Sequence, residues 1–280
     1  MKEPLISVLM GIYNCADTLE EAVQCIIKQT YTNWELILCD DCSTDRTLQI
    51  AETLAKRDKR IIVLKNEKNL TLAPTLNRCL QIARGKYVAR MDGDDLCATE
   101  RFEKELKFLE EHPEYALVSC QMNLFDDDGV YRTIVHPSNP DKEGWVRKSQ
   151  FCHAGCMMRT EVLRELNGYS ESSTRKRVED YDLWVRMYAK GYIGYNLQEA
   201  LYDMRDDRNA LHRRTYQNRI NEARVKYNAC KDLKLKKRYY IWIISPILKW
   251  LTPSFFYKMM HKKGNENRPA SYSQYLKDKK

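Results

Sequence analysis

Short apolar runs alternate with segments of helical periodicity over the first 95 residues of this 280-residue chain. The runs that predict β-strands lie at 5–10, 34–39, 61–64 and 86–91, and the patterns that predict helices lie at 18–29, 48–55 and 72–83. Such alternation builds β-α-β units, in which the strands pair in parallel and helices cover the sheet. We therefore predict an α/β fold with a mostly parallel sheet and helices on both faces, with ligands bound at the carboxyl ends of the strands.

The pattern changes after residue 95. A helix is expected at 101–111, a hairpin at 115–125 and 130–135, and further helices at 160–166 and 179–190. From residue 206 the chain reads as helical and without strands. We expect an α/β domain over 1–205 and an amphipathic helical tail over 206–280.

Positive charge is concentrated in this tail. The chain has a formal net charge of +8, but residues 205–280 hold 20 Lys and Arg against 6 Asp and Glu, a net of +14. The remainder of the chain is therefore acidic. A basic tail indicates an anionic partner, such as a lipid surface or a nucleic acid.

The ten cysteines are expected to be free thiols. No apolar signal segment precedes the first strand, and most cysteines lie within apolar runs. Both features favour reduced, buried thiols in a cytoplasmic protein. The pair Cys39 and Cys42, and the group Cys152, His153 and Cys156, lack the second ligand pair that a structural zinc site needs.

Acidic clusters follow two of the predicted parallel strands. Asp40 and Asp41 end the strand at 34–39, and the run 92–95 (Asp-Gly-Asp-Asp) ends the strand at 86–91. A carboxylate at the end of the strand at 34–39 can accept a hydrogen bond from a nucleobase N–H. The structural alternative for this first cluster is that residues 43–45 cap the next helix. Three carboxylates within four residues repel one another unless a cation joins them, and Mg²⁺ or Mn²⁺ prefers carboxylate and phosphate oxygens. The second cluster therefore predicts a metal–diphosphate site.

A third cluster, Glu179-Asp180-Tyr181-Asp182, opens the helix at 179–190. Acidic residues are common at helix N-termini, so this cluster alone is weak evidence. A sugar transfer from a nucleotide diphosphate needs a base for the acceptor hydroxyl and a cation for the departing diphosphate. The chain offers carboxylates for each role. A dinucleotide-dependent oxidoreductase is disfavoured, because no G-x-G-x-x-G follows the first strand.

Over residues 4–210 the chain resembles a family 2 glycosyltransferase of the Rossmann-like GT-A fold. Five segments in order carry the resemblance: SVLMGIYN (7–14), LILCDDCSTD (36–45), ARGKYVARMDGDD (83–95), HAGCMMRTEVLRELNGY (153–169) and VEDYDLWVRM (178–187). The resemblance implies a catalytic domain over 1–205. Residues 1–95 would form its nucleotide-binding half and 96–205 its acceptor-binding half.

The resemblance also implies how the donor is bound. Tyr13 would stack on the base, usually uracil, and Asp41 would hydrogen-bond it. Arg90 and Asp92 would complete the nucleotide site. Asp92 begins the D-x-D element.

The remaining roles concern the metal and the chemistry. Asp94 or Asp95 would contact the divalent cation, Mn²⁺ or Mg²⁺. Asp180 would be the general base of an inverting, in-line displacement. Glu179 would lie on the acceptor side.

The sequence departs from the family's fuller patterns at two places. The Gln-x-x-Arg-Trp motif of processive members is missing, which favours addition of a single sugar. The late metal-touching His is also missing, and Arg205 or Arg208 would neutralise the diphosphate instead. On the acceptor side we place His153 and Trp184, although a structural role for His153 fits the sequence equally well.

The tail combines aromatic and basic residues. The segment 239–260 is rich in Trp, Ile, Phe and Met, and between Lys231 and Lys263 nine basic residues face only Asp232. The Ser245-Pro246 and Thr252-Pro253 pairs each predict a helix start. We expect 231–263 to bind an anionic membrane surface. The alternative is that its aromatic residues pack on the catalytic domain; nucleic-acid binding is not expected, since no reading motif is present.

The sequence therefore predicts a cytoplasmic enzyme, bound peripherally to the inner face of the membrane. It would transfer one sugar from a nucleotide diphosphate-sugar, most simply a UDP-sugar, to a saccharide or lipid-linked saccharide used in surface polysaccharide or glycoconjugate assembly. The alternative of a different class is a non-catalytic sugar-nucleotide-binding subunit of a glycan-assembly complex. The sequence indicates neither the sugar nor the oligomeric state.

Overall fold

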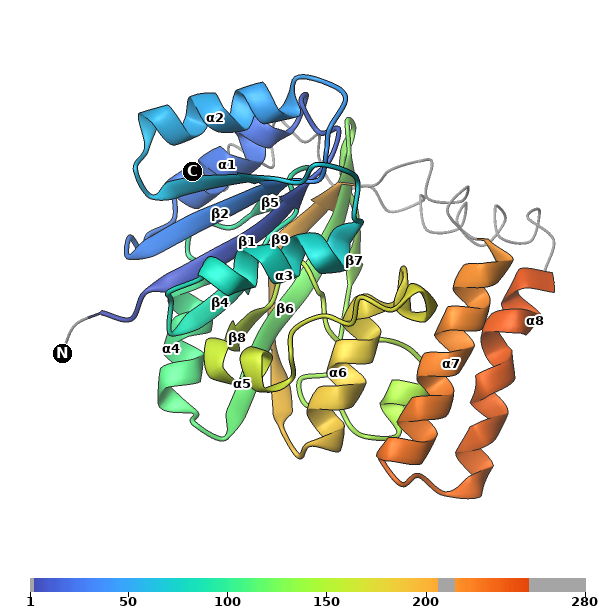
Figure 1. The fold of residues 1–280 in the computed structure, drawn as a ribbon. Coiled ribbons are helices and arrows are strands. Elements are labelled where there is room, and N and C mark those ends of the chain that lie inside the picture. Colours follow the sequence, from blue (N-terminus) through green and yellow to red (C-terminus); the bar gives the residue numbers. More distant parts are fainter. Residues whose placement is uncertain (1–2, 206–214, 252–280) are drawn as a thin grey trace.

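A computed structural model of the chain describes residues 3–205 and 215–251, and they form one nine-stranded sheet flanked by helices (Figure 1). The strands are β1 (Ile6–Ile12), β2 (Trp34–Asp40), β3 (Ile61–Lys65), β4 (Tyr87–Arg90), β5 (Leu96–Cys97), β6 (Tyr115–Asp126), β7 (Gly129–Ile134), β8 (Met157–Arg159) and β9 (Ile193–Arg205). The α-helices are α1 (Leu19–Ile27), α2 (Thr47–Arg57), α3 (Leu72–Ile82), α4 (Arg101–Glu111), α5 (Thr160–Glu165), α6 (Glu179–Ala189), α7 (Tyr216–Asp232) and α8 (Ser245–Leu251). The strand order is β3-β2-β1-β4-β8-β6-β9-β5, with β7 paired to β6.

The first half of the sheet is parallel. β1 pairs in parallel with β2 and β4, and β2 pairs in parallel with β3. The carboxyl ends of these strands therefore meet at one edge of the sheet, where the amide of Asp41 donates a hydrogen bond of 2.8 Å to the carbonyl of Ile12. The predicted strands and helices up to residue 91 are all present.

Side chains of the central strands point alternately into two hydrophobic cores. Val8 and Met10 of β1 pack with α1, α2 and α4, whereas Leu9 packs on the opposite face with α3, α5 and α6. This alternation is the two-residue period of a strand buried on both sides. The prediction of helices on both faces is confirmed (Figure 1).

Beyond β4 the pairing is mixed. β8 runs antiparallel between β4 and β6, β9 is parallel to β6, and β5 is antiparallel to β9. The sequence did not predict these three added strands. β5 and β8 are only two and three residues long, and polar residues at Asn196, Gln198 and Glu199 interrupt the apolar pattern of β9.

Helix α7 packs into the core on the face of the sheet that α3, α5 and α6 cover. The side chain of Thr215 caps it by accepting a hydrogen bond from the amide of Asn218, and Val225, Ala229 and Cys230 join the core that contains α6. After α7, the 3₁₀ helix η4 (Lys237–Ile244) leads directly into α8.

The structure bears on two predictions for the tail and on one for the cysteines. The helix start predicted at 245–246 is confirmed by α8, whereas the one at 252–253 lies outside the described residues. Within 3–205 and 215–251, none of the helices has the length and hydrophobicity that crossing a membrane requires. All ten cysteines are unpaired, and seven are buried.

Candidate active site

Two pockets lie side by side at the carboxyl ends of the parallel strands, and both are lined by Gly11, Ile12 and Tyr13. The Asp41 pocket has a volume of about 370 Å³, and its other walls include Asp41, Asn69, Thr71, Lys176, Arg177 and Glu179. The Asp94 pocket has a volume of about 380 Å³, and its other walls include Asn14, Asp17, Asp92, Gly93, Asp94 and Arg205. The half-exposed ring of Tyr13 is shared by the two pockets.

Asp41 organises the wall of its own pocket. One carboxylate oxygen accepts hydrogen bonds from the Asn66 side-chain amide and the Leu70 amide, each at 2.7 Å, and the other accepts one from the Thr71 amide at 2.9 Å. Thr71 has a positive φ of 72°, a strained conformation that these bonds stabilise. Sequence reasoning missed this loop, because nothing in its residues signals a ligand site.

The neighbouring acidic residues have structural roles. Asp45 accepts a hydrogen bond of 2.9 Å from the amide of Thr47 in the first turn of α2. Asp40 is buried and accepts one from the amide of Ser43 at 3.1 Å. The capping alternative therefore holds for Asp45, whereas Asp40 fixes the loop before α2. Asp41 is the member of the cluster that lines a pocket.

The Asp92-Gly93-Asp94-Asp95 turn divides its carboxylates between the pocket and the interior. Asp92 and Asp94 line the Asp94 pocket. A Cβ at Gly93 would lie 3.0 Å from both Cys15 Sγ and Ile12 Cγ2, so glycine allows the turn to pack closely against β1. Asp95 is 2% exposed and does not line the pocket.

Asp95 joins the turn to the last residues of β9. Its carboxylate accepts hydrogen bonds from the Tyr202 hydroxyl at 2.7 Å and from the Arg205 amide at 2.8 Å. Arg205 in turn donates from Nε to the carbonyl of Asp94 at 3.0 Å, and it forms an ion pair with Glu21. Arg205 thereby becomes a wall of the Asp94 pocket, whereas Arg208 lies outside the described residues.

Arg90 lies beneath the turn and lines neither pocket. Its guanidinium is 2% exposed, ion-pairs with Asp92 and donates to the carbonyl of Met91. This buried charge holds Asp92 in place. The structure therefore places Arg90 behind the acidic turn and not at the pocket surface.

The electrostatics of the turn favour a bound cation. Burial and the neighbouring Asp92 raise the pKa of Asp94, and the same causes together with Asp94 raise the pKa of Asp95. A divalent cation would relieve this repulsion. Within 3–205 and 215–251 no group of three or more His, Cys, Asp or Glu side chains could hold a metal by itself. Asp92 and Asp94 fit a cation that takes its other ligands from substrate phosphates.

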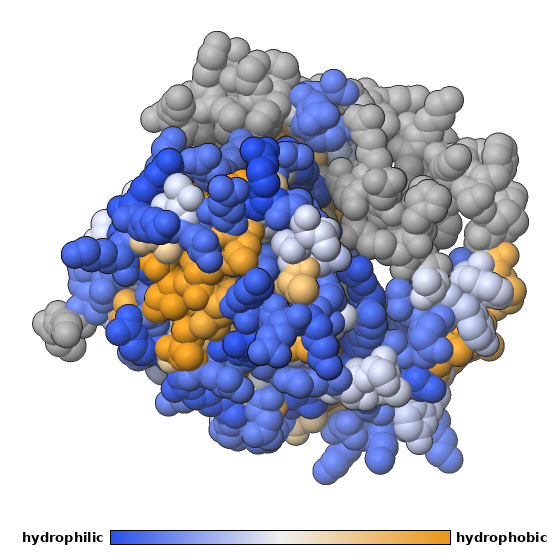
Figure 2. Space-filling view, turned by 45° about the horizontal axis from the view of Figure 1, so that its top comes forward, coloured by the Kyte–Doolittle hydropathy of each residue, from blue (hydrophilic) through white to orange (hydrophobic). Residues whose placement is uncertain are grey.

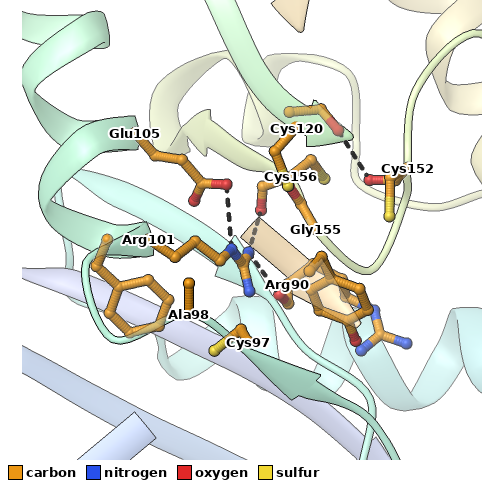
Figure 3. A network of polar contacts seen from close by, with 12 residues as sticks. Arg90, Cys97, Ala98, Arg101, Glu105, Cys120, Cys152, Gly155 and Cys156 are labelled. Atoms are coloured by element: carbon orange, nitrogen blue, oxygen red, sulfur yellow. Dashed lines mark hydrogen bonds and ion pairs between the residues drawn. The ribbon is translucent and has the colours of Figure 1, made fainter. Parts of the chain in front are cut away.

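A buried ion pair supports the turn from behind (Figure 3). Arg101 of α4 donates from Nη2 to the carbonyl of Arg90 at 2.9 Å and from Nε to Glu105 at 3.1 Å. Both side chains of the pair are fully buried, and burial raises the pKa of Glu105 to about 7. Sequence reasoning missed this pair. The sequence feature that could have revealed it is the i,i+4 spacing of two opposite charges beside the apolar stripe of the helix at 101–111.

Asp180 lies in the first turn of α6 and lines neither pocket itself, whereas Glu179 beside it lines the Asp41 pocket. Burial and the neighbouring Glu179 raise the pKa of Asp180 to about 7. A carboxylate with a pKa near 7 can accept a proton and release it again at neutral pH. The electrostatics of Asp180 therefore suit a general base.

His153 and Trp184 lie behind the helix start. His153 hydrogen-bonds through Nε2 to the Tyr169 hydroxyl at 2.9 Å, and burial and the charge of Arg90 hold its pKa well below the usual value. Its ring centroid is 6.0 Å from that of Trp184, which is 1% exposed. Neither residue lines the two pockets, and the contacts of both are packing contacts; their place on the acceptor side stays a prediction.

Comparison with known proteins gives a consistent result. The model of the family described as glycosyl transferase family 2 matches residues 7–166. The Bacillus subtilis (strain 168) protein that bears the name "Putative glycosyltransferase EpsE" is 45% identical over 95% of this chain and 96% of its own length. The Escherichia coli UDP-Glc:alpha-D-GlcNAc-diphosphoundecaprenol beta-1,3-glucosyltransferase WfaP is 32% identical over 69% of this chain and 73% of its own length. Residues 1–349 of Staphylococcus aureus TarS, solved in complex with UDP-GlcNAc, share the fold with a TM-score of 0.67 at 22% identity, over 87% of this chain and 71% of that one.

Proposed function

Since this chain belongs to glycosyl transferase family 2, we propose that it transfers a single sugar from a UDP-sugar to a hydroxyl of a lipid-linked saccharide. The transfer inverts the anomeric carbon and requires a divalent cation. The relatives support the substrate classes: WfaP is named for a UDP-Glc donor and a diphosphoundecaprenol-linked acceptor, and the TarS complex contains UDP-GlcNAc.

The observation that carries this proposal is the junction of the two pockets at Tyr13. In the proposed complex the nucleobase occupies the Asp41 pocket, stacked on the Tyr13 ring and hydrogen-bonded by Asp41. The diphosphate then extends past Tyr13 into the Asp94 pocket. A nucleoside diphosphate has this sequence of parts, an aromatic base followed by charged phosphates.

The Asp94 pocket would hold the cation and the diphosphate. Asp94 and Asp92 are the proposed metal-side carboxylates, and Arg205 supplies a fixed positive charge on the same wall. When bound, the cation supplies Lewis-acid stabilisation of the departing diphosphate. Asp95 and Arg90 act as positioning residues. Arg208, which was also expected at the diphosphate, remains a proposal outside the described residues.

Asp180 is the proposed general base. The acceptor hydroxyl gives its proton to the Asp180 carboxylate while its oxygen attacks the anomeric carbon. The bond between that carbon and the diphosphate oxygen breaks, and UDP leaves with the bonding electron pair. One displacement at the anomeric carbon inverts its configuration.

We further propose that the C-terminal tail binds an anionic membrane surface at the cytoplasmic face. Six apolar side chains of η4 and α8 are at least 40% exposed: Ile241, Trp242, Ile244, Leu248, Trp250 and Leu251. Hydrophobic surface is visible at this end of the molecule, at the right of Figure 2. Basic residues from Lys231 to Lys249 flank it, and the remaining part of the proposed segment, up to residue 263, lies outside the described residues. Apolar insertion together with basic flanks is the chemistry of interfacial binding.

A transfer assay tests the enzymatic proposal. Purified protein with Mn²⁺ is supplied with UDP-Glc, UDP-GlcNAc or GDP-Man and with a synthetic GlcNAc-diphosphate-lipid, and UDP or GDP release and product anomeric configuration are measured. We expect UDP release that depends on the acceptor and a product of inverted configuration. Binding of UDP-sugars without transfer to this or other saccharide acceptors would instead indicate a non-catalytic sugar-nucleotide-binding subunit.

A further inference from the structure

Two exposed cations stand at the rim of the Asp41 pocket, and the charge of one of them, Arg177, acts on the nearby Glu179. Lys176 and Arg177 line this pocket together with Tyr13, Asp41 and Glu179. Neither side chain takes part in an ion pair or hydrogen bond within the described part of the chain. Adjacent unpaired cations beside a ligand pocket are suited to bind an anion.

The backbone at these two residues is held in a defined conformation. Arg177 has a positive φ of 68°, a backbone conformation that is strained for a residue with a side chain. On one side of the loop, Arg175 forms an ion pair with the buried carboxylate of Asp182 in α6. The amide of Val178 donates to the carbonyl of Arg175 at 3.0 Å. The strained conformation is therefore stabilised by contacts immediately around it.

Helix α7 holds the other side of the loop. The Asn221 side chain is 1% exposed, and its amide donates to the carbonyl of Lys176 at 3.1 Å and to that of Ser173 at 3.4 Å. Asn221 thus connects the first helix of the tail to the backbone of the two cations. A buried amide that bonds two carbonyls of one loop fixes the position of that loop.

We propose that Lys176 and Arg177 form a diphosphate-binding subsite, which Asn221 positions from α7. This inference rests on the proposed function, in which both the nucleotide-sugar donor and the lipid-linked acceptor carry a diphosphate. The donor diphosphate, held at the Asp94 pocket, would reach the two cations only where the pockets meet at Tyr13, whereas an acceptor diphosphate would approach from the rim. Glu179, two residues after Arg177, lines the same pocket, and Asp180 follows it. The two cations therefore lie only a few residues before the proposed base in the chain.

The test uses the full chain with the double substitution K176A/R177A. The matched control is K56A/R57A, which removes the same adjacent Lys-Arg pair from the exposed end of α2, next to the amino end of β3 and away from the pockets. Binding of UDP and of uridine is measured calorimetrically with Mn²⁺. The KM is measured for a GlcNAc-diphosphate-lipid and for an uncharged GlcNAc glycoside.

Two results would support the subsite and identify its source of diphosphate. A fall of about tenfold or more in UDP affinity with unchanged uridine affinity assigns it to the donor, as expected for loss of charge-assisted hydrogen bonds. An unchanged UDP affinity with a KM raised about tenfold for the diphosphate-lipid alone assigns it to the acceptor. In either case N221A should shift the same parameter, and N228A on the same helix should not.

Other results would overturn the subsite. They are equal losses of UDP and uridine affinity, or no change in UDP affinity and in either KM. Thermal unfolding of K176A/R177A and of the milder K176Q/R177Q excludes loss of the fold as the cause. A wild-type protein that binds no UDP would contradict the proposed function itself, which separates that failure from failure of the subsite.

Discussion

The hydroxyl of Tyr202 donates a hydrogen bond of 2.7 Å to Asp95 and so joins β9 to the acidic turn after β4. The last carboxylate of the turn is thereby directed into the protein, while Asp94 lines the pocket. Asp94 and Asp95, both predicted from the sequence as metal ligands, are thus placed in different environments. They are expected to respond differently to mutation.

The first prediction concerns Tyr202→Phe. Removing the hydroxyl leaves the buried Asp95 carboxylate with one donor fewer, which is expected to destabilise the protein by about 1–3 kcal/mol. We also expect weaker Mn²⁺-dependent UDP binding, because the turn loses its anchor to β9. Urea denaturation and calorimetry measure the two effects. Tyr195→Phe, at a hydroxyl elsewhere on β9, is the control. An unchanged free energy of unfolding for Tyr202→Phe would contradict the anchoring role.

The second prediction concerns turnover. Asp180→Asn should bind UDP and Mn²⁺ like the wild type but lose about 10²–10⁴-fold in kcat, because general-base catalysis contributes that much. Steady-state transfer kinetics and calorimetry on the same preparation separate these quantities. A near-normal kcat would show that Asp180 is not the base.

The third prediction is the pH dependence of transfer. Asp180 must be ionised to accept a proton, and burial and Glu179 raise its pKa to about 7. The logarithm of kcat/KM should therefore fall as the pH decreases below about 7, with a slope approaching one. A pH profile from 5 to 9 tests this. A flat profile down to pH 5 would mean that no group with this pKa is required in its ionised form.

The fourth prediction concerns the cost of Asp180 to stability. The folded-state pKa of about 7 lies above the usual 3.8, so the folded protein resists ionisation of Asp180 while the unfolded chain does not. The destabilisation is absent below about pH 4, increases as the pH rises to about 7 and is constant above that. Asp180→Asn should raise the free energy of unfolding at pH 8 by at most about 4 kcal/mol and leave it unchanged near pH 4.

Asp182→Asn is the control for this fourth prediction. Asp182, two residues further along α6, is ion-paired to Arg175 and to Arg186. Its substitution should destabilise the protein, which is the opposite sign. Denaturation curves at both pH values compare the two variants. Equal effects of both substitutions at pH 8 would contradict the assignment.

The fifth prediction concerns the tail. Trp250 and Leu251 are 47% and 63% exposed, and their replacement in W250S/L251S should lower binding to phosphatidylglycerol vesicles about tenfold or more. The control V135S/I193S removes exposed apolar side chains elsewhere and should leave vesicle binding unchanged. Co-sedimentation at low and high salt measures both. Vesicle binding that is unaffected by W250S/L251S would favour a different use of this surface.

The sequence predicted the parallel half of the sheet because β1 to β4 and their helices have strong local patterns. It also predicted Tyr13, Asp41, Asp92 and Asp94 as site residues, since these residues follow buried strands or match family segments. The same local signals predict that each of these residues lies at the carboxyl edge of the sheet. The structure adds the pockets that bring them together.

Long-range contacts explain what the sequence did not reveal. The bond between Asp95 and Tyr202 spans 107 positions, so the buried position of Asp95 could not be read from its own segment. The raised pKa of Asp180 depends on burial, which the charged sequence around it does not indicate. The packed position of Trp184 likewise follows from the neighbours of α6 in three dimensions.

Metal-dependent nucleotide binding is the property on which the proposed function depends most directly. Calorimetric titration of UDP is carried out with Mn²⁺ and with EDTA, for the wild type and for Asp94→Ala, with GDP as the comparison nucleotide. We predict UDP binding to the wild type in Mn²⁺, a large loss of affinity in EDTA and in Asp94→Ala, and weaker binding of GDP. UDP affinity that is equal in Mn²⁺ and EDTA, or absent under both conditions, would contradict a metal–diphosphate site at Asp94.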